Sequence, residues 1–185
     1  NKAGVNNPNG KLVLSLNFLG YSYKVYDTKL PLKNGMENGK TASSIYRKVC
    51  IDIEEKKVQK IKEKICKAVY SFSKTKDFDL LFDRISFLTS NRELKKKERG
   101  KSVPTGIYYN YASIDAHADS LKNLDKFLIS VLAGKSGRLS KISTMHMTGE
   151  HKSNLLRLSF ARGFEKRVHR KFSPNRLKEI TKAWL

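Results

Sequence analysis

The residues best suited to bind a metal lie in one short stretch, MHMTGEHK, which runs from Met145 to Lys152. It contains His146, Glu150 and His151, and two imidazoles with a carboxylate are common ligands of catalytic zinc. A metal-dependent nuclease is therefore one function class to consider. The spacing is not the His-x-x-x-His of a helical zinc site, and no second ligand cluster follows. We predict no metal site in this chain, and cleavage by the isolated chain would favour the nuclease instead.

Other catalytic patterns are incomplete. The stretch LAGKSGR, residues 132–138, contains a GKS triplet but lacks the upstream glycine and the preceding strand of a phosphate-binding loop. Asp77, Asp79 and Asp83 lie on or near a predicted helix N-terminus, where the helix dipole favours acids. No triad and no paired carboxylates for two-metal chemistry are visible. The sequence therefore predicts no catalytic residue in this chain.

The charge points to a different kind of chemistry. The chain has 185 residues, with 38 Lys and Arg against 17 Asp and Glu, and its formal net charge is +21. Such an excess attracts polyanions, so RNA and DNA are the predicted partners. We expect no membrane association, because no apolar run of about 18 residues and no signal peptide are present. With only Cys50 and Cys66 and no disulfide framework, we expect a reduced, cytoplasmic protein.

One group of basic residues recurs at helical spacing. Asp52 and Glu55 form a capping-box pattern at the start of the strongest predicted helix. On one face of this helix, lysines recur at intervals of four, four and three residues, which suits contacts along a phosphate backbone. The alternative is a solvated face supported by Glu–Lys pairs. The candidate nucleic-acid contacts on this helix are Lys56, Lys60, Lys64 and Lys67.

Further basic candidates lie in a predicted mobile loop and in the C-terminal third. The loop, residues 92–101, contains Lys95, Lys96 and Lys97. The C-terminal candidates are Arg157, Arg162, Arg167 and Arg170. Three tyrosines, Tyr108, Tyr109 and Tyr111, could stack on bases or serve as ordinary packing residues. The basic residues are predicted to contact nucleic acid without reading its sequence.

The predicted elements make this a mainly α chain with a short N-terminal β-hairpin. Apolar residues alternate from Leu12 to Phe18, and from Leu19 the alternation changes parity, which requires a bend that Gly20 permits. A turn-rich link follows. Helical patterns then cover residues 52–72, 77–94, 115–133 and 152–172, and a last helix begins at the Ser173 cap with Pro174 in its first position. We therefore expect a hairpin, a basic helical thumb and a C-terminal helical bundle.

The bend carries a resemblance to a known family. The segment LNFLGYSY, residues 16–23, resembles the primer-grip motif of reverse transcriptases. The longer stretches TASSIYRKVCIDIEEKKVQKIKEKICKAVYSF and RGFEKRVHRKFSPNRLKEI, with the order hairpin, link and basic helices, look like the C-terminal part of bacterial antiviral reverse transcriptases. The resemblance is to the retron- and abortive-infection-related group, and in particular to a partner in a two-polymerase phage-defence system.

The resemblance implies a parent RNA-directed DNA polymerase whose catalytic Tyr-x-Asp-Asp and Mg²⁺ ligands lie upstream, outside this chain. The implied primer-grip residues are Phe18, Leu19, Gly20 and Tyr21. Residues 1–40 would be the grip hairpin and linker at the end of the palm, 41–104 the thumb, and 105–185 a helical extension.

The implied partners are an RNA and DNA primer-template, a non-coding RNA, and a partner polymerase or second copy. Because the chain begins with Asn1, we expect it to be part of a longer protein. The alternative function is a non-enzymatic RNA-binding structural module of a ribonucleoprotein, for which the charge alone suffices.

Overall fold

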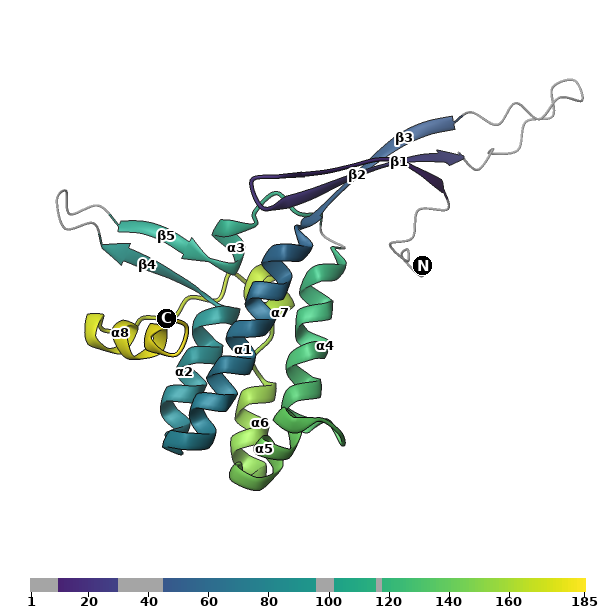
Figure 1. The fold of residues 1–185 in the computed structure, drawn as a ribbon. Helices are drawn as coiled ribbons and strands as arrows, with labels where there is room; N and C mark the ends of the chain where they lie inside the picture. The colour runs from purple at the N-terminus through teal and green to yellow at the C-terminus, as the bar shows by residue number, and fades with distance from the viewer. Residues whose placement is uncertain (1–9, 30–44, 96–101, 116–117) are drawn as a thin grey trace, which may run out of the picture. The chain divides into compact units, whose positions relative to one another are not determined.

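The structure is a computed structural model that describes residues 10–29, 45–95, 102–115 and 118–185 (Figure 1). The strands are β1 (Gly10–Phe18), β2 (Tyr21–Lys29), β3 (Ile45–Ile53), β4 (Asn91–Lys95) and β5 (Ser102–Gly106). The longer helices are α1 (Glu55–Thr75), α2 (Phe78–Thr89) and α4 (Asp119–Ala133). The shorter helices are α3 (Ile107–Asn110), α5 (Arg138–His146), α6 (Gly149–Leu156), α7 (Phe160–Glu165) and α8 (Pro174–Lys182).

The chain divides into two compact units. Unit 1 comprises Asn1–Glu55 and Ser113–Asp119, and unit 2 comprises Lys56–Ala112 and Ser120–Leu185. Within the described residues, unit 1 contains one three-stranded sheet, and unit 2 contains the helices and a two-stranded sheet. The predicted boundaries at residues 40 and 104 came from the family resemblance and stay predictions.

The prediction of a mainly α chain with one short hairpin is wrong. The described residues form five strands in two sheets alongside eight helices, so the chain is mixed α and β. The strand β3 lies within the range predicted as a helical thumb, although its branched apolar residues Val49, Ile51 and Ile53 recur at every second position, as in a strand. The strands β4 and β5 pair where a mobile basic loop was predicted. The charged residues of β4 led to the loop prediction, whereas the antiparallel pairing with β5 joins backbone groups.

The predicted hairpin is confirmed, and a third strand extends it. The strand order is β1-β2-β3, and both pairs are antiparallel. The register shifts between Leu12 and Leu14, which indicates a β-bulge. In β3, the backbone N–H of Ile51 donates to the Asp115 carboxylate at 2.9 Å, and the Asp115 N–H donates to the Ile51 carbonyl at 2.9 Å. Asp115 therefore pairs with the backbone of β3.

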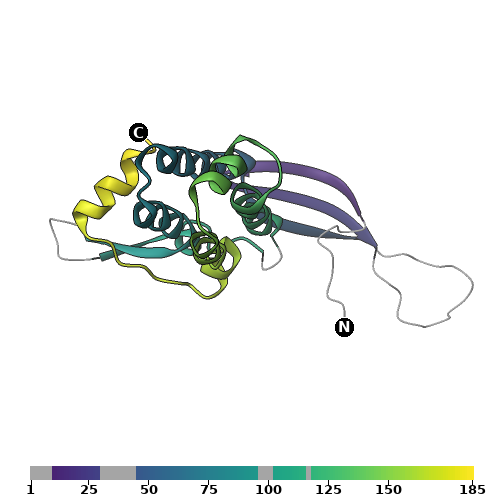
Figure 2. The same cartoon turned by 90° about the horizontal axis from the view of Figure 1, so that it is seen from below.

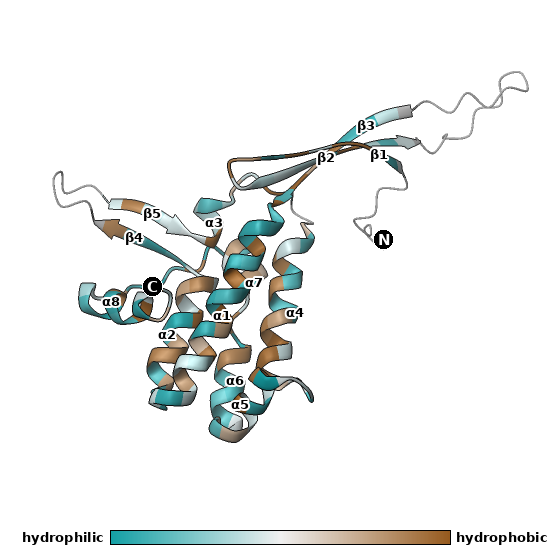
Figure 3. Ribbon diagram, viewed as in Figure 1, coloured by the Kyte–Doolittle hydropathy of each residue, from teal (hydrophilic) through white to brown (hydrophobic). Residues whose placement is uncertain are grey.

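The core of unit 2 is helical. The helices α1, α2 and α4 lie side by side in Figures 1 and 2, and their apolar stripes are visible in Figure 3. As the helical patterns predict, buried apolar residues recur at helical spacing in α1 and α4, whereas Ile61 of α1 and Phe78, Phe82 and Leu88 of α2 are half-buried. The largest fully buried side chains of the unit include Ile65, Phe72, Leu81, Ile85, Leu124, Leu128, Leu132, Leu155, Phe160 and Ile180. None of the helices described has the length and apolar character needed to span a bilayer.

The C-terminal third contains shorter helices than predicted. One helix was expected across residues 152–172, but α6 ends at Leu156 and α7 begins at Phe160. The break is stabilised by Ser159, whose side chain accepts the Arg162 N–H, and by Asp125 of α4, whose carboxylate accepts the N–H groups of Phe160 and Ala161. The predicted cap at Ser173 is confirmed, because its side chain accepts the Arg176 N–H.

Candidate nucleic-acid interface

The tip of the β1–β2 hairpin consists of Phe18, Leu19, Gly20 and Tyr21, the four predicted primer-grip residues. Phe18 pairs directly with Tyr21, so Leu19 and Gly20 form a two-residue turn. Both turn residues have positive φ angles, 50° for Leu19 and 86° for Gly20, as a type I′ turn requires. The Leu19 side chain is 81% exposed and that of Phe18 is 58% exposed. The tip therefore presents apolar side chains to the surroundings.

Leu19 occupies this position at an energetic cost. The left-handed backbone conformation costs about 1–2 kcal/mol of conformational free energy for a residue with a Cβ. Asn or Gly is the usual residue in such turns. Because the Leu19 side chain is exposed among the described residues, its burial there does not offset this cost. Strain of this kind persists where the structure or the function requires it. The stability of the hairpin alone therefore gives no reason for a leucine at this point.

The turn also explains the change of parity in the sequence. Across a two-residue turn, Leu16 faces Tyr23 and Leu14 faces Val25, so the apolar residues of both strands share one face of the sheet. Residues Val49, Ile51 and Ile53 of β3 pair with that set and extend the face. Several of its side chains are about half exposed, namely Leu14 at 56%, Leu16 at 55% and Val49 at 51%. We call this surface the apolar sheet face.

The lysine row of α1 consists of Lys56, Lys60, Lys64 and Lys67. At 100° per residue these positions fall within an arc of about 80° on the helix. Lys56, Lys60 and Lys67 are exposed. Among the described residues, none of the four forms an ion pair with a carboxylate. The alternative of a face neutralised by Glu–Lys pairs therefore has no support in the described part of the chain.

Lys64 differs from the other three lysines. Its ammonium lies 5.3 Å from the centre of the Trp184 ring, and its backbone carbonyl accepts the Trp184 indole N–H at 3.0 Å. Partial burial lowers the pKa of Lys64, and the nearby charges of Arg92 and Lys60 lower it further. Lys64 therefore has a packing role as well as a charge, which the sequence did not indicate.

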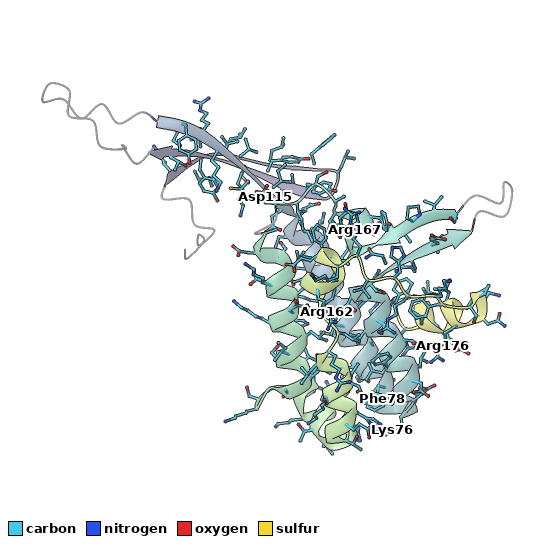
Figure 4. All side chains as sticks on the ribbon, turned by 180° about the vertical axis from the view of Figure 1, so that it is seen from behind. Lys76, Phe78, Asp115, Arg162, Arg167 and Arg176 are labelled. Atoms are coloured by element: carbon cyan, nitrogen blue, oxygen red, sulfur yellow. The ribbon has the colours of Figure 1, made fainter. Side chains whose placement is uncertain are left out.

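Three of the four predicted C-terminal arginines come together. Arg157, Arg162 and Arg170 line one pocket of about 540 Å³ in unit 2, which we call the arginine pocket. Arg167 lies elsewhere, with its guanidinium carbon 4.2 Å from the centre of the Tyr108 ring. It has a φ of 47°, which follows the end of α7. Figure 4 shows Arg162 and Arg167 on this part of the chain.

Tyr108 and Tyr109 both contact other aromatic rings. Besides Arg167, the Tyr108 ring contacts Phe164 at 5.3 Å and Tyr109 at 5.3 Å between ring centres. The Tyr109 hydroxyl lies 3.4 Å from Nε2 of His169, and Tyr109 is 38% exposed. Of the two, Tyr109 is therefore the more accessible to a base.

Some predicted residues lie outside what the structure describes. Lys96 and Lys97 fall in the range 96–101, and for Lys95 only the backbone, at the end of β4, is described. Among the described residues, no group of three or more His, Cys, Asp or Glu side chains is arranged to hold a metal ion. His151 instead stacks on Phe78, with ring centres 3.8 Å apart. The Mg²⁺ that the family resemblance implies, with ligands outside this chain, stays a prediction.

Sequence reasoning missed the residue that positions this region, Asn91. It is fully buried, and its Nδ2 donates to the carbonyls of Gly163 and Val168 at 3.1 and 3.2 Å. Its Oδ1 accepts the Tyr108 N–H at 2.8 Å, and its backbone carbonyl accepts the Arg170 N–H at 2.8 Å. Asn91 thus joins the start of β4 to α7 and to Arg170. No local pattern marks it, because its partners are distant in the sequence.

Replacement of Asn91 by Leu is expected to lower the free energy of unfolding by about 3 kcal/mol, because it removes the side-chain hydrogen bonds of a fully buried residue and leaves the Tyr108 N–H without its acceptor. Urea unfolding measures this loss. The matched control is Asn123→Leu on the exposed surface of α4, for which a change within about 0.5 kcal/mol is expected. Equal unfolding midpoints for the two variants would contradict the role given to Asn91.

The described residues thus offer three surfaces suited to nucleic acid: the hairpin tip in unit 1, and the lysine row and the arginine pocket in unit 2. The first is apolar and strained, and the other two are basic. Comparison of the chain with protein-family models, with curated proteins and with solved structures found no match.

Proposed function

We propose that this chain is the nucleic-acid-binding part of an RNA-directed DNA polymerase, in which the hairpin tip holds the primer end and basic helices hold the duplex. The single observation that carries the proposal is Leu19, which is 81% exposed at a φ of 50°. By the resemblance of its sequence, we further propose a role in phage defence. The catalytic carboxylates and Mg²⁺ would belong to the parent polymerase outside this chain.

The geometry of the tip suits a primer grip. A polymerase must hold the primer end to within about 1 Å, because small misplacements cost large factors in rate. A type I′ turn is short, and Gly20 adopts its φ of 86° without the strain that a side chain would cause. The Gly20 carbonyl also accepts the Glu54 N–H at 2.9 Å, which fixes the turn against the end of β3. An exposed leucine at such a tip can contact the sugar and base of a primer end without reading its sequence.

The lysine row supports the second part of the proposal. Lysines at this spacing along a helix can contact successive phosphates, and such contacts hold a duplex without sequence preference. Because Lys56, Lys60 and Lys67 are exposed and have no carboxylate partner among the described residues, their charges are available to an external anion.

The apolar sheet face is consistent with packing against another part of a larger polymerase. Exposed contiguous apolar surface of this kind marks an interaction site in a soluble protein. We propose that the palm of the parent polymerase packs on this face, with the hairpin tip projecting toward the primer. This would place Phe18 at the border between the palm contact and the nucleic acid.

A second candidate function is a non-enzymatic RNA-binding module of a ribonucleoprotein. It is favoured by the net charge of +21, which needs no polymerase to explain it. Under this function the lysine row and the arginines would bind RNA in the same way. The strained apolar tip would have no assigned role, and for that reason we place the polymerase first.

The test of the proposed function combines binding and synthesis by the full-length protein. We expect binding of an RNA–DNA hybrid with a recessed primer end, with log K falling by about 3 or more per unit of log salt concentration, because three open lysines each release about 0.9 counterions. We also expect extension of a DNA primer on an RNA template. Absence of binding at low salt would contradict both candidates, and binding without extension would leave the ribonucleoprotein module.

A further inference from the structure

The arginine pocket combines positive charge with aromatic surface. Its lining includes Phe78 and Phe82 of α2, and Arg157, Arg162 and Arg170 from the segment that contains α6 and α7. Figure 4 shows Phe78 at the start of α2 and Arg162 on α7. The volume of about 540 Å³ lies within the range of roughly 300–1,000 Å³ that is usual for small-molecule sites. The pocket therefore has room for one ligand the size of a nucleotide.

The guanidinium groups of the pocket are available to an anion. Among the described residues, none of the three arginines forms an ion pair or donates a side-chain hydrogen bond. One carboxylate, that of Asp79, also lines the pocket, so positive charge still exceeds negative. Guanidinium groups bind phosphate oxygens with two parallel hydrogen bonds, which makes phosphate the best matched anion.

The aromatic rings supply a second, different recognition element. His151 stacks on Phe78 with ring centres 3.8 Å apart and planes 9° apart, so one face of Phe78 is already covered and the ring is held in place. The Arg170 guanidinium lies 5.8 Å from the centre of the Phe82 ring. Planar bases stack on rings and guanidinium groups held in this way. A site that binds a nucleotide must hold both its phosphate and its base, and this one cavity has groups suited to each.

We propose that the arginine pocket binds a single nucleotide, with its phosphate on the arginines and its base against Phe78 and Phe82. This proposal adds a specific site to the nucleic-acid-binding part of the proposed function. It rests on the proposed function only in taking nucleotides as the class of ligand. The nucleotide can come from two sources, a free mononucleotide or the 5′-phosphorylated end of a single RNA strand. The pocket lies within unit 2, so it requires neither the hairpin tip nor the parent polymerase.

Calorimetric titration of the full-length protein with adenosine 5′-monophosphate tests the pocket. We expect a dissociation constant below about 1 mM, and adenosine and inorganic phosphate each binding at least about tenfold more weakly. Arg162→Gln is expected to weaken binding about tenfold or more, through loss of a charged hydrogen bond. Phe78→Leu is expected to weaken it about tenfold, through loss of stacking.

The matched control is Arg138→Gln at the exposed start of α5, which lies outside the pocket and should leave binding unchanged. A melting curve for each variant shows that it is folded. Equal weakening by Arg138→Gln and Arg162→Gln would overturn the proposal, because it would indicate general charge attraction. If Arg162→Gln were unfolded, Phe78→Leu would decide the matter by itself.

Single-stranded RNA octamers with and without a 5′-phosphate distinguish the two sources. Tighter binding of the phosphorylated octamer than of the mononucleotide, lost in Arg162→Gln, supports the strand end. Equal or weaker binding of the octamer, with the mononucleotide still bound, supports the free nucleotide. No saturable binding of either ligand overturns the pocket. Absence of nucleotide binding by the unaltered protein, with normal primer extension, would refute the pocket alone. Nucleotide binding by the unaltered protein without primer extension would refute the polymerase alone.

Discussion

DNA synthesis by the full-length protein is expected to fall about 100-fold when Leu19 is replaced by Asn, while the hairpin stays as stable as before or becomes more stable. Asn-Gly is the preferred pair for a type I′ turn, and Asn tolerates the φ of 50° that Leu19 adopts. The variant therefore keeps the backbone of the tip and removes its apolar side chain. Single-turnover primer extension, with urea unfolding alongside, measures the two effects separately.

The control for this variant is Leu12→Asn. Leu12 is 48% exposed on the same strand, but it pairs with Tyr26 and lies on the opposite face from Phe18, away from the tip. It should leave primer extension within about twofold, since exposed substitutions away from a site have small effects. Full activity of a folded Leu19→Asn protein would remove the primer-grip assignment. An equal loss in both variants would show that general apolar surface matters, and not the tip.

A substitution at Gly20 gives a complementary result. Gly20→Val places a β-branched residue at a φ of 86°, which L residues adopt only with strain. We expect this variant to lose both synthesis and stability, in contrast to Leu19→Asn, which should lose synthesis only.

The second large effect is expected from the lysine row. Replacement of Lys56, Lys60 and Lys67 by Gln should weaken duplex binding by the order of 100-fold at about 0.1 M salt, and should reduce the salt slope by about 3, because each lost phosphate contact removes about 0.9 released counterions. Lys64 is left in place because it packs on Trp184. The fold should survive, since the buried stripe of α1 is unchanged.

Three exposed lysines of α4 and α5, Lys122, Lys126 and Lys141, provide the matched control. Their replacement by Gln removes the same charge from a different surface, so the salt slope should change by less than about 1. Anisotropy titrations at several salt concentrations give both slopes. Equal slopes for the two triple variants would mean that binding depends on the net charge and not on the α1 row.

Some elements were predictable because their signals are local. The hairpin followed from the alternation before and after Leu19, and the turn from the one residue, Gly20, that allows a positive φ without cost. The buried stripes of α1 and α4 followed from helical spacing. The start of α8 followed from a serine cap and a proline. Each of these signals depends on residues within a few positions of each other.

Other elements were missed because the groups that stabilise them lie outside their own segment. The strand β3 forms because it pairs with β2, and the charged strand β4 and the uncharged strand β5 form because they pair with each other. The break before α7 depends on Asp125, about 35 residues away, which accepts N–H groups at the start of that helix. In each case the backbone groups are paired by a partner outside the few neighbouring positions that local propensity reflects, so local propensity gave the wrong element.

The same distinction holds for the candidate sites. The sequence by itself determined the charge, the lysine spacing on one helix and the apolar hairpin tip, because these follow from composition and from the geometry of single elements. Only the tertiary structure decided that Arg157, Arg162 and Arg170 share a pocket with Phe78, that Arg167 lies on Tyr108, and that Lys64 is packed. The physical reason is that a pocket requires side chains from several elements, and their approach is fixed by long-range packing and by buried hydrogen bonds such as those of Asn91.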